Sequence, residues 1–152
     1  MNLSKTPEIV EWTPTHFLFV EKIGPFQDTA RAAWEELHAG IKALKTGSTL
    51  RGMMAIYRMD PEMIYRAGAL LSERPTMVPP GMTYELFEGG KYARYTLTGP
   101  YDQLPEASGL VFESFEESDL EWRDGFCVEH YVNNPDDTAP ADLITQIHLP
   151  IE

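Results

Sequence analysis

Hydrophobic residues along this chain follow two spacings, one typical of strands and one typical of helices. Alternation of apolar and polar positions predicts a strand over 15–23, and aromatic and β-branched residues closed by a turn signal predict one over 126–132. Further strands are predicted over 52–59, 63–71, 84–87, 91–98 and 143–151. Apolar residues three and four positions apart predict helices over 27–44 and 102–117, each with one apolar face. Pro105 falls in the first turn of the second helix, where a missing N–H is tolerated.

The same order of elements occurs twice. Gly24-Pro25-Phe26 and Gly99-Pro100-Tyr101 each end a strand ahead of a helix, and they lie 75 residues apart. Asp60-Pro61 and Asn134-Pro135 each follow the next strand and lie 74 residues apart. Matching strand breaks, helices and turns at a nearly constant offset indicate two copies of a strand–helix–strand–strand unit.

The repeat predicts an α+β fold with a single domain over 1–152 and halves at about 15–71 and 91–151. Two units related by pseudo-twofold symmetry would form one antiparallel sheet, with both main helices on one face and a groove between them. Trp34 of the first copy aligns with Gly109 of the second. A large ring in one copy and no side chain in the other would leave room for a cavity.

Composition narrows the range of functions. The 152 residues carry a formal charge of −12, which argues against direct binding of DNA or RNA and suits a cationic small molecule or a basic protein surface. No apolar stretch is long enough to cross a membrane, and the first residues lack the apolar segment of a secretory signal. With Cys127 as the one cysteine no internal disulfide can form, so we expect a reducing, cytoplasmic location.

One acidic residue is the main candidate for ligand chemistry. Glu129 lies in the middle of the strand over 126–132, on the same side as Cys127 and Tyr131. A carboxylate among apolar neighbours costs free energy unless a cation pairs with it. Two interpretations are open: a solvated outer face, which is the commoner situation for a glutamate in a strand, or a buried anion that receives a cationic ligand.

Several aromatic residues are candidates to surround Glu129. At the repeat offset Tyr131 corresponds to Tyr57 and Glu129 to Ala55, so both tyrosines should project with Glu129 toward the helices. Core packing is the ordinary alternative for each ring, although a buried tyrosine hydroxyl needs a partner. The candidate ligand-binding residues are Glu129, Trp34, Tyr57, Tyr131, Tyr65, Tyr95 and Phe112.

Metal, cofactor and nucleophile chemistry are not indicated by the sequence. The four histidines fit no metal-ligand spacing: His16, His38, His130 and His148. Cys127 would share a face with Glu129, and a thiolate beside a carboxylate is disfavoured. We therefore predict no metal site and no cofactor.

Four segments resemble a known family: Gly90-Lys91-Tyr92-Ala93, Gly99-Pro100-Tyr101, Val128 to Pro135 (VEHYVNNP) and Leu143 to Ile151 (LITQIHLPI). They resemble the GyrI-like domain, whose fold also forms the effector-binding domain of some AraC-type and MerR-type transcription regulators. The resemblance covers about Thr15 to Ile151 and implies a duplicated strand–helix–strand–strand fold. It also implies an aromatic pocket in which one acidic residue, Glu129 by its place in the motif, attracts lipophilic cations.

The regulators join this domain to a helix-turn-helix, which the residues before Thr15 do not provide. We therefore expect a stand-alone domain that senses or sequesters lipophilic or cationic aromatic compounds. One alternative is hydrolysis of cyclopropane-containing alkylating compounds, a reaction of some family members, with Glu129 and either Tyr57 or Tyr131 positioning and activating water. Another is a protein partner, by analogy with family members that bind and inhibit DNA gyrase.

Overall fold

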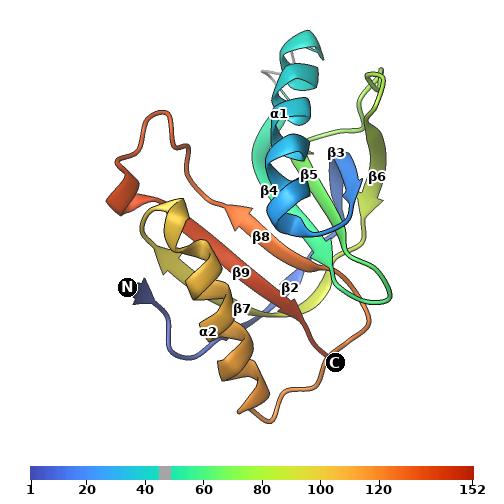
Figure 1. Ribbon diagram of the computed structural model, residues 1–152. Coiled ribbons are helices and arrows are strands. Elements are labelled where there is room, and N and C mark those ends of the chain that lie inside the picture. Colours follow the sequence, from blue (N-terminus) through green and yellow to red (C-terminus); the bar gives the residue numbers. More distant parts are fainter. Residues whose placement is uncertain (45–48) are drawn as a thin grey trace. The chain divides into compact units, whose positions relative to one another are not determined.

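The computed structural model describes residues 1–44 and 49–152, which divide into two compact units. The terminal unit joins Met1–Trp12 to Gly90–Glu152, and the central unit is Thr13–Gly89. Each unit has a sheet and a main helix of its own (Figure 1).

The central unit is an antiparallel sheet with a helix on one face. Its strands are β3 (Thr15–Ile23), β4 (Leu50–Arg58), β5 (Ile64–Leu71) and β6 (Thr83–Phe87), in the order β4-β5-β3-β6. Helix α1 (Phe26–Leu44) lies on the face that carries Leu18, Ala69 and Leu71, where Ile41 packs against them. The apolar stripe of the helix and the alternating side chains of the strands therefore bury one another.

The terminal unit has the same design with two added strands. Its elements are β1 (Asn2–Leu3), β2 (Glu8–Trp12), β7 (Gly90–Thr98), the 3-10 turn η1 (Tyr101–Gln103), α2 (Leu104–Glu116), β8 (Cys127–Tyr131), the 3-10 turn η2 (Pro140–Asp142) and β9 (Ile144–Pro150). Strand β9 lies between β8 and β7, and both β1 and β2 pair with the other edge of β7. Helix α2 buries Ala107, Val111 and Phe115.

The predicted repeat is present in the topology of the two units. The central unit runs β3-α1-β4-β5 and the terminal unit runs β7-α2-β8-β9. In both units the last strand of the repeat lies between the other two, and every pairing is antiparallel. The α+β class and the antiparallel strand–helix–strand–strand repeat are confirmed, whereas the single-domain assignment and the groove between the helices stay predictions.

The residues before Thr15 form two strands that the hydrophobic pattern did not predict. Strand β2 pairs with β7 from Glu8 opposite Arg94 to Trp12 opposite Gly90. The segment EIVEW lies between Pro7 and Pro14 and does not alternate strictly, because Ile9 and Val10 are adjacent apolar residues, so the pattern gave no clear strand signal there. Pairing with the edge of a strand 78 to 86 residues later in the chain stabilises it, and the local sequence does not report that contact.

The second helix begins later than predicted. The chain first makes the 3-10 turn η1, and the α-helix starts at Leu104, so that Pro105 lies in its first turn as expected. Proline is tolerated at this position because its fixed φ suits the first turn of a helix. No helix in the described part of the chain is long and apolar enough to cross a membrane.

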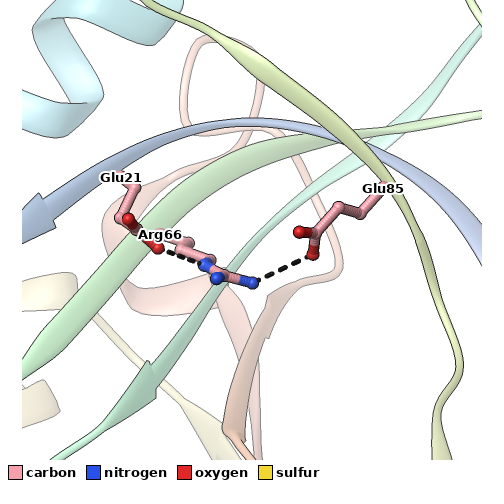
Figure 2. A network of polar contacts seen from close by, with 3 residues as sticks. All are labelled: Glu21, Arg66 and Glu85. Atoms are coloured by element: carbon pink, nitrogen blue, oxygen red, sulfur yellow. Dashed lines mark hydrogen bonds and ion pairs between the residues drawn. The ribbon is translucent and has the colours of Figure 1, made fainter.

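The sheet face of the central unit that points away from α1 carries a charged network (Figure 2). Arg66 Nε donates to Glu21 Oε1 at 2.7 Å, and Arg66 Nη1 donates to Glu85 Oε2 at 3.1 Å. The guanidinium carbon also lies 4.7 Å from the centroid of the Phe19 ring. These contacts tie β5, β3 and β6 together on that face, although exposed ion pairs of this kind contribute only about 0–1 kcal/mol each.

Gly68 on the same face is required by close packing. A Cβ added at Gly68 would lie 2.1 Å from Phe17 Cε1, and the Phe17 ring is buried and stacked on Phe19 at 5.0 Å. Gly68→Ala should therefore lower the free energy of unfolding by roughly 1–3 kcal/mol, the usual cost of overpacking a core. Urea denaturation measures this change.

Gly109→Ala is the matched control. Gly109 lies in α2, and a Cβ added there would have no neighbouring atom within 4 Å. That substitution should stabilise the protein by about 0.5–1 kcal/mol, as expected for alanine in a helix. Equal stability of the Gly68→Ala variant and the parent would contradict the packing described around Phe17.

Candidate functional site

Glu129 and Tyr131 form a small cluster on the sheet face of the terminal unit that α2 covers, and Tyr95 projects from the same face. The register places Glu129 opposite Ile147, and Ile147 opposite Tyr95, so these side chains share one face. The Tyr95 hydroxyl lies 3.4 Å from Ser114 Oγ of α2, which identifies this face as the helix side. Tyr131 projects to the same side because it lies two residues from Glu129 in β8.

Glu129 is half-buried and is held by a neighbouring tyrosine. Tyr131 Oη donates a hydrogen bond to Glu129 Oε1 at 2.8 Å. Burial raises the pKa of the Glu129 carboxyl above its ordinary value of 4.5, and the Tyr131 hydrogen bond offsets part of that rise. Among the residues that the structure describes, no lysine, arginine or histidine forms an ion pair with Glu129. The described residues therefore hold a partly desolvated acid without supplying its counter-ion.

Cys127 also lies on β8, and its surroundings keep it protonated. The side chain is buried and unbridged. Burial, together with the negative charge of Glu129, raises the pKa of the Cys127 thiol to about 12. A thiol with so high a pKa is a poor nucleophile at neutral pH, so Cys127 acts as a small packing residue.

Tyr101 is a member of this cluster that the sequence interpretation missed. Its ring packs edge-on against Tyr131 with centroids 5.5 Å apart and planes at 67°, and burial raises the pKa of its hydroxyl. The central unit has the equivalent pair, Phe26 against Tyr57, at 5.5 Å and 70°. The aromatic residue that ends each Gly-Pro-aromatic step thus packs on a tyrosine of the second strand of its repeat, and that repeated signal was visible in the sequence.

The predicted aromatic residues of the central unit form a cluster of their own on the α1 side of its sheet. Trp34 Nε1 donates a hydrogen bond to Tyr65 Oη at 2.8 Å. The ring centroids of Phe26 and Tyr65 lie 5.7 Å apart. Tyr57 and Tyr65 are opposite one another on β4 and β5, and both are buried. Three of the candidate residues are therefore connected: Tyr57 and Tyr65 contact Phe26, and Trp34 contacts Tyr65.

The two remaining candidates have other neighbours. Tyr95 is buried beneath α2 beside Ser114. Phe112 stacks on Trp122 with ring centroids 5.7 Å apart, and Trp122 in turn packs on Phe115 with ring centroids 4.4 Å apart. Phe112 therefore contacts Trp122, and its part in ligand binding stays a prediction. Within the described residues there is no group of three or more His, Cys, Asp or Glu side chains that could hold a metal ion.

Comparison with known proteins identifies the family of the chain. The family model of the GyrI-like small-molecule-binding domain matches residues 5–152 of the chain. The protein belongs to the GyrI-like family. A search of curated proteins finds no match.

Solved structures of low sequence identity share the fold of this GyrI-like domain. The C-terminal domain of EcmrR has a TM-score of 0.80 and 15% identity, with 100% of this chain and 99% of that chain covered. SAV2435 bound to tetraphenylphosphonium has a TM-score of 0.73 and 11% identity, with 96% of this chain and 93% of that chain covered. A hydrolase from Listeria innocua has a TM-score of 0.65 and 15% identity, with 98% and 93% covered.

Proposed function

We propose that this GyrI-like domain binds small apolar molecules that carry a positive charge, with Glu129 as the counter-ion. The observation that carries the proposal is the half-buried Glu129 carboxylate, which accepts a hydrogen bond from Tyr131 and forms no ion pair within the described residues. A desolvated acid of this kind is costly in the free protein, and a bound cation removes that cost. One structural neighbour is bound to a lipophilic cation, tetraphenylphosphonium, which supports the same ligand class here.

The aromatic neighbours of Glu129 favour a ligand that is both apolar and cationic. The faces of Tyr131 and Tyr101 can attract a cation by about 0.5–2 kcal/mol each, the larger value applying when water is excluded. The net charge of −12 adds a general attraction for cations that salt will screen. Neutral apolar compounds gain the packing contribution alone and should bind more weakly.

Three naphthalene compounds of similar size test the proposal by isothermal titration calorimetry. They are naphthylmethylammonium, its quaternary relative naphthylmethyl-trimethylammonium, and neutral naphthylmethanol. At least one of the two cations should bind the protein about tenfold or more tightly than the alcohol, because Glu129 interacts with charge. If neither cation binds more tightly than the alcohol, the proposed function is wrong.

The aromatic residues of the central unit can be tested with the same compounds. Trp34, Tyr57 and Tyr65 are candidate ligand contacts from their sequence positions, and Trp34 donates a hydrogen bond to Tyr65. Trp34→Phe removes that donor and keeps an aromatic side chain. A change in the affinity for the cations would assign Trp34 a part in binding, and an unchanged affinity would leave it a core residue.

Hydrolysis is the second candidate, and the contact between Glu129 and Tyr131 is the observation that favours it. A carboxylate whose pKa is raised is a better general base, and a tyrosine 2.8 Å away can orient it. One structural neighbour is described as a hydrolase. Incubation with a cyclopropane-containing alkylating compound, followed by mass spectrometry, should then show the hydrolysed product with the parent and not with Glu129→Gln.

A further inference from the structure

Thr145 is a buried polar side chain beside the cluster formed by Glu129, Tyr131 and Tyr101. It lies on β9 directly opposite Tyr131 of β8, and β8 and β9 run side by side (Figure 1). Because directly opposite residues project to the same side of a sheet, Thr145 shares the face of Glu129. Its side chain is 0% exposed.

The Thr145 hydroxyl has no hydrogen-bond partner among the described residues. Buried hydroxyl groups are nearly always hydrogen-bonded, because burying one without a partner costs free energy. Valine has almost the same shape and would pack between Leu97 and Tyr131, the two residues opposite Thr145, without that cost. A threonine at this position therefore needs a partner that the described residues do not supply.

The groups around Thr145 determine what kind of partner fits. Glu129 as a carboxylate can only accept hydrogen bonds, and the Tyr131 hydroxyl uses its hydrogen on Glu129. The Thr145 hydroxyl can accept through its oxygen and donate through its hydrogen, so this patch offers several acceptors, one hydroxyl donor and one negative charge. A positively charged group with N–H donors satisfies both features, whereas a quaternary ammonium or phosphonium group supplies only the charge.

We propose that Thr145 is a specificity-determining residue: its buried hydroxyl accepts a hydrogen bond from the ligand and directs the site to protonated amines and amidines in preference to quaternary cations. This inference rests on the proposed function, because it concerns the same ligand. It goes further by naming the N–H donor as a required feature of the preferred ligand.

The test compares the affinities of naphthylmethylammonium and naphthylmethyl-trimethylammonium by calorimetry. The parent should bind the N–H-bearing cation about tenfold more tightly than the quaternary one, the usual effect of one hydrogen bond to a charged donor. Thr145→Val should remove this preference by weakening the ammonium compound alone. Thr145→Ser keeps the hydroxyl and should retain the preference, and a thermal midpoint measured without ligand verifies that each variant is folded.

Failure of the Thr145 inference and failure of the proposed function give different binding results. Equal affinity of the parent for the two cations, or a preference that survives in Thr145→Val, overturns the role of Thr145 while leaving the cation site in place. If neither cation binds more tightly than naphthylmethanol, the proposed function fails and this inference fails with it. The comparison of the two cations on the parent needs no variant, so the result does not depend on the folding of a mutant.

Discussion

Replacing Glu129 with glutamine should weaken the binding of naphthylmethylammonium by about 30-fold or more, which corresponds to about 2 kcal/mol. Glutamine keeps the size of the side chain and its ability to accept a hydrogen bond from Tyr131, but it carries no charge. The ligand ammonium would then enter a half-buried environment without a counter-ion. Binding of neutral naphthylmethanol should change by less than about twofold, because it does not use the charge.

Glu113→Gln is the matched control for this substitution. Glu113 is exposed on α2, so its replacement changes the net charge by the same amount without altering the Glu129 cluster. The control should bind naphthylmethylammonium as the parent does. If Glu113→Gln and Glu129→Gln lose affinity equally, the attraction comes from the overall negative charge, and the account of Glu129 as a specific counter-ion is incorrect.

The same Glu129→Gln variant should be more stable than the parent without ligand near pH 8. Because burial raises the folded-state pKa of Glu129 above the unfolded value of 4.5, the folded protein holds its proton more tightly than the unfolded chain does. Its contribution to stability is therefore present at low pH and is lost as the pH rises through the folded-state pKa. The neutral glutamine does not undergo this loss, and urea denaturation at several pH values will show the difference.

Acid should destabilise the protein through His148, with a full effect of roughly 3 kcal/mol. His148 is 1% exposed and lies on the sheet face opposite to Glu129, where Trp12 packs edge-on at 5.1 Å and Tyr92 at 5.9 Å. Burial lowers the pKa of His148 from 6.5 to about 4. His130 contacts the same Trp12 ring, and burial lowers its pKa too.

The direction of the acid effect follows from which state takes up the proton first. As the pH falls from 6.5 toward 4, the unfolded chain protonates its histidine while the folded protein does not, so the free energy of unfolding decreases over that window. His148→Gln removes this linkage and should flatten the decrease measured between about pH 8 and pH 5. The difference between variant and parent near pH 8, where both side chains are neutral, measures the packing cost of the substitution alone. An equally steep decrease in the two proteins would contradict the burial of His148.

The fold was largely predictable because its signals are local and occur twice. Two Gly-Pro-aromatic steps and two X-Pro turns at nearly the same offset defined the repeat, and the structure has that topology in both units. Strands β1 and β2 were not predicted because pairing with the edge of β7 stabilises them, a contact with residues far along the chain.

The candidate site was less predictable than the fold. Alternation along β8 indicated that Glu129 and Tyr131 share a face, and their 2.8 Å hydrogen bond agrees with that. Tyr101 and Phe26 were treated only as parts of a strand break, although their rings pack on Tyr131 and Tyr57. Thr145 could not be found from sequence at all, because its importance lies in a hydroxyl without a partner, which is a property of packing.

The most direct test of the central claim is the ionisation of Glu129 itself, followed by carbon-13 NMR of its carboxyl group. The signal can be assigned by its absence in Glu129→Gln. In the ligand-free protein the carboxyl should titrate clearly above its ordinary value of 4.5, and saturating naphthylmethylammonium should move the midpoint down. A midpoint at or below 4.5 that the ligand does not shift would show that Glu129 is a solvated surface acid, and the proposed cation site would be contradicted.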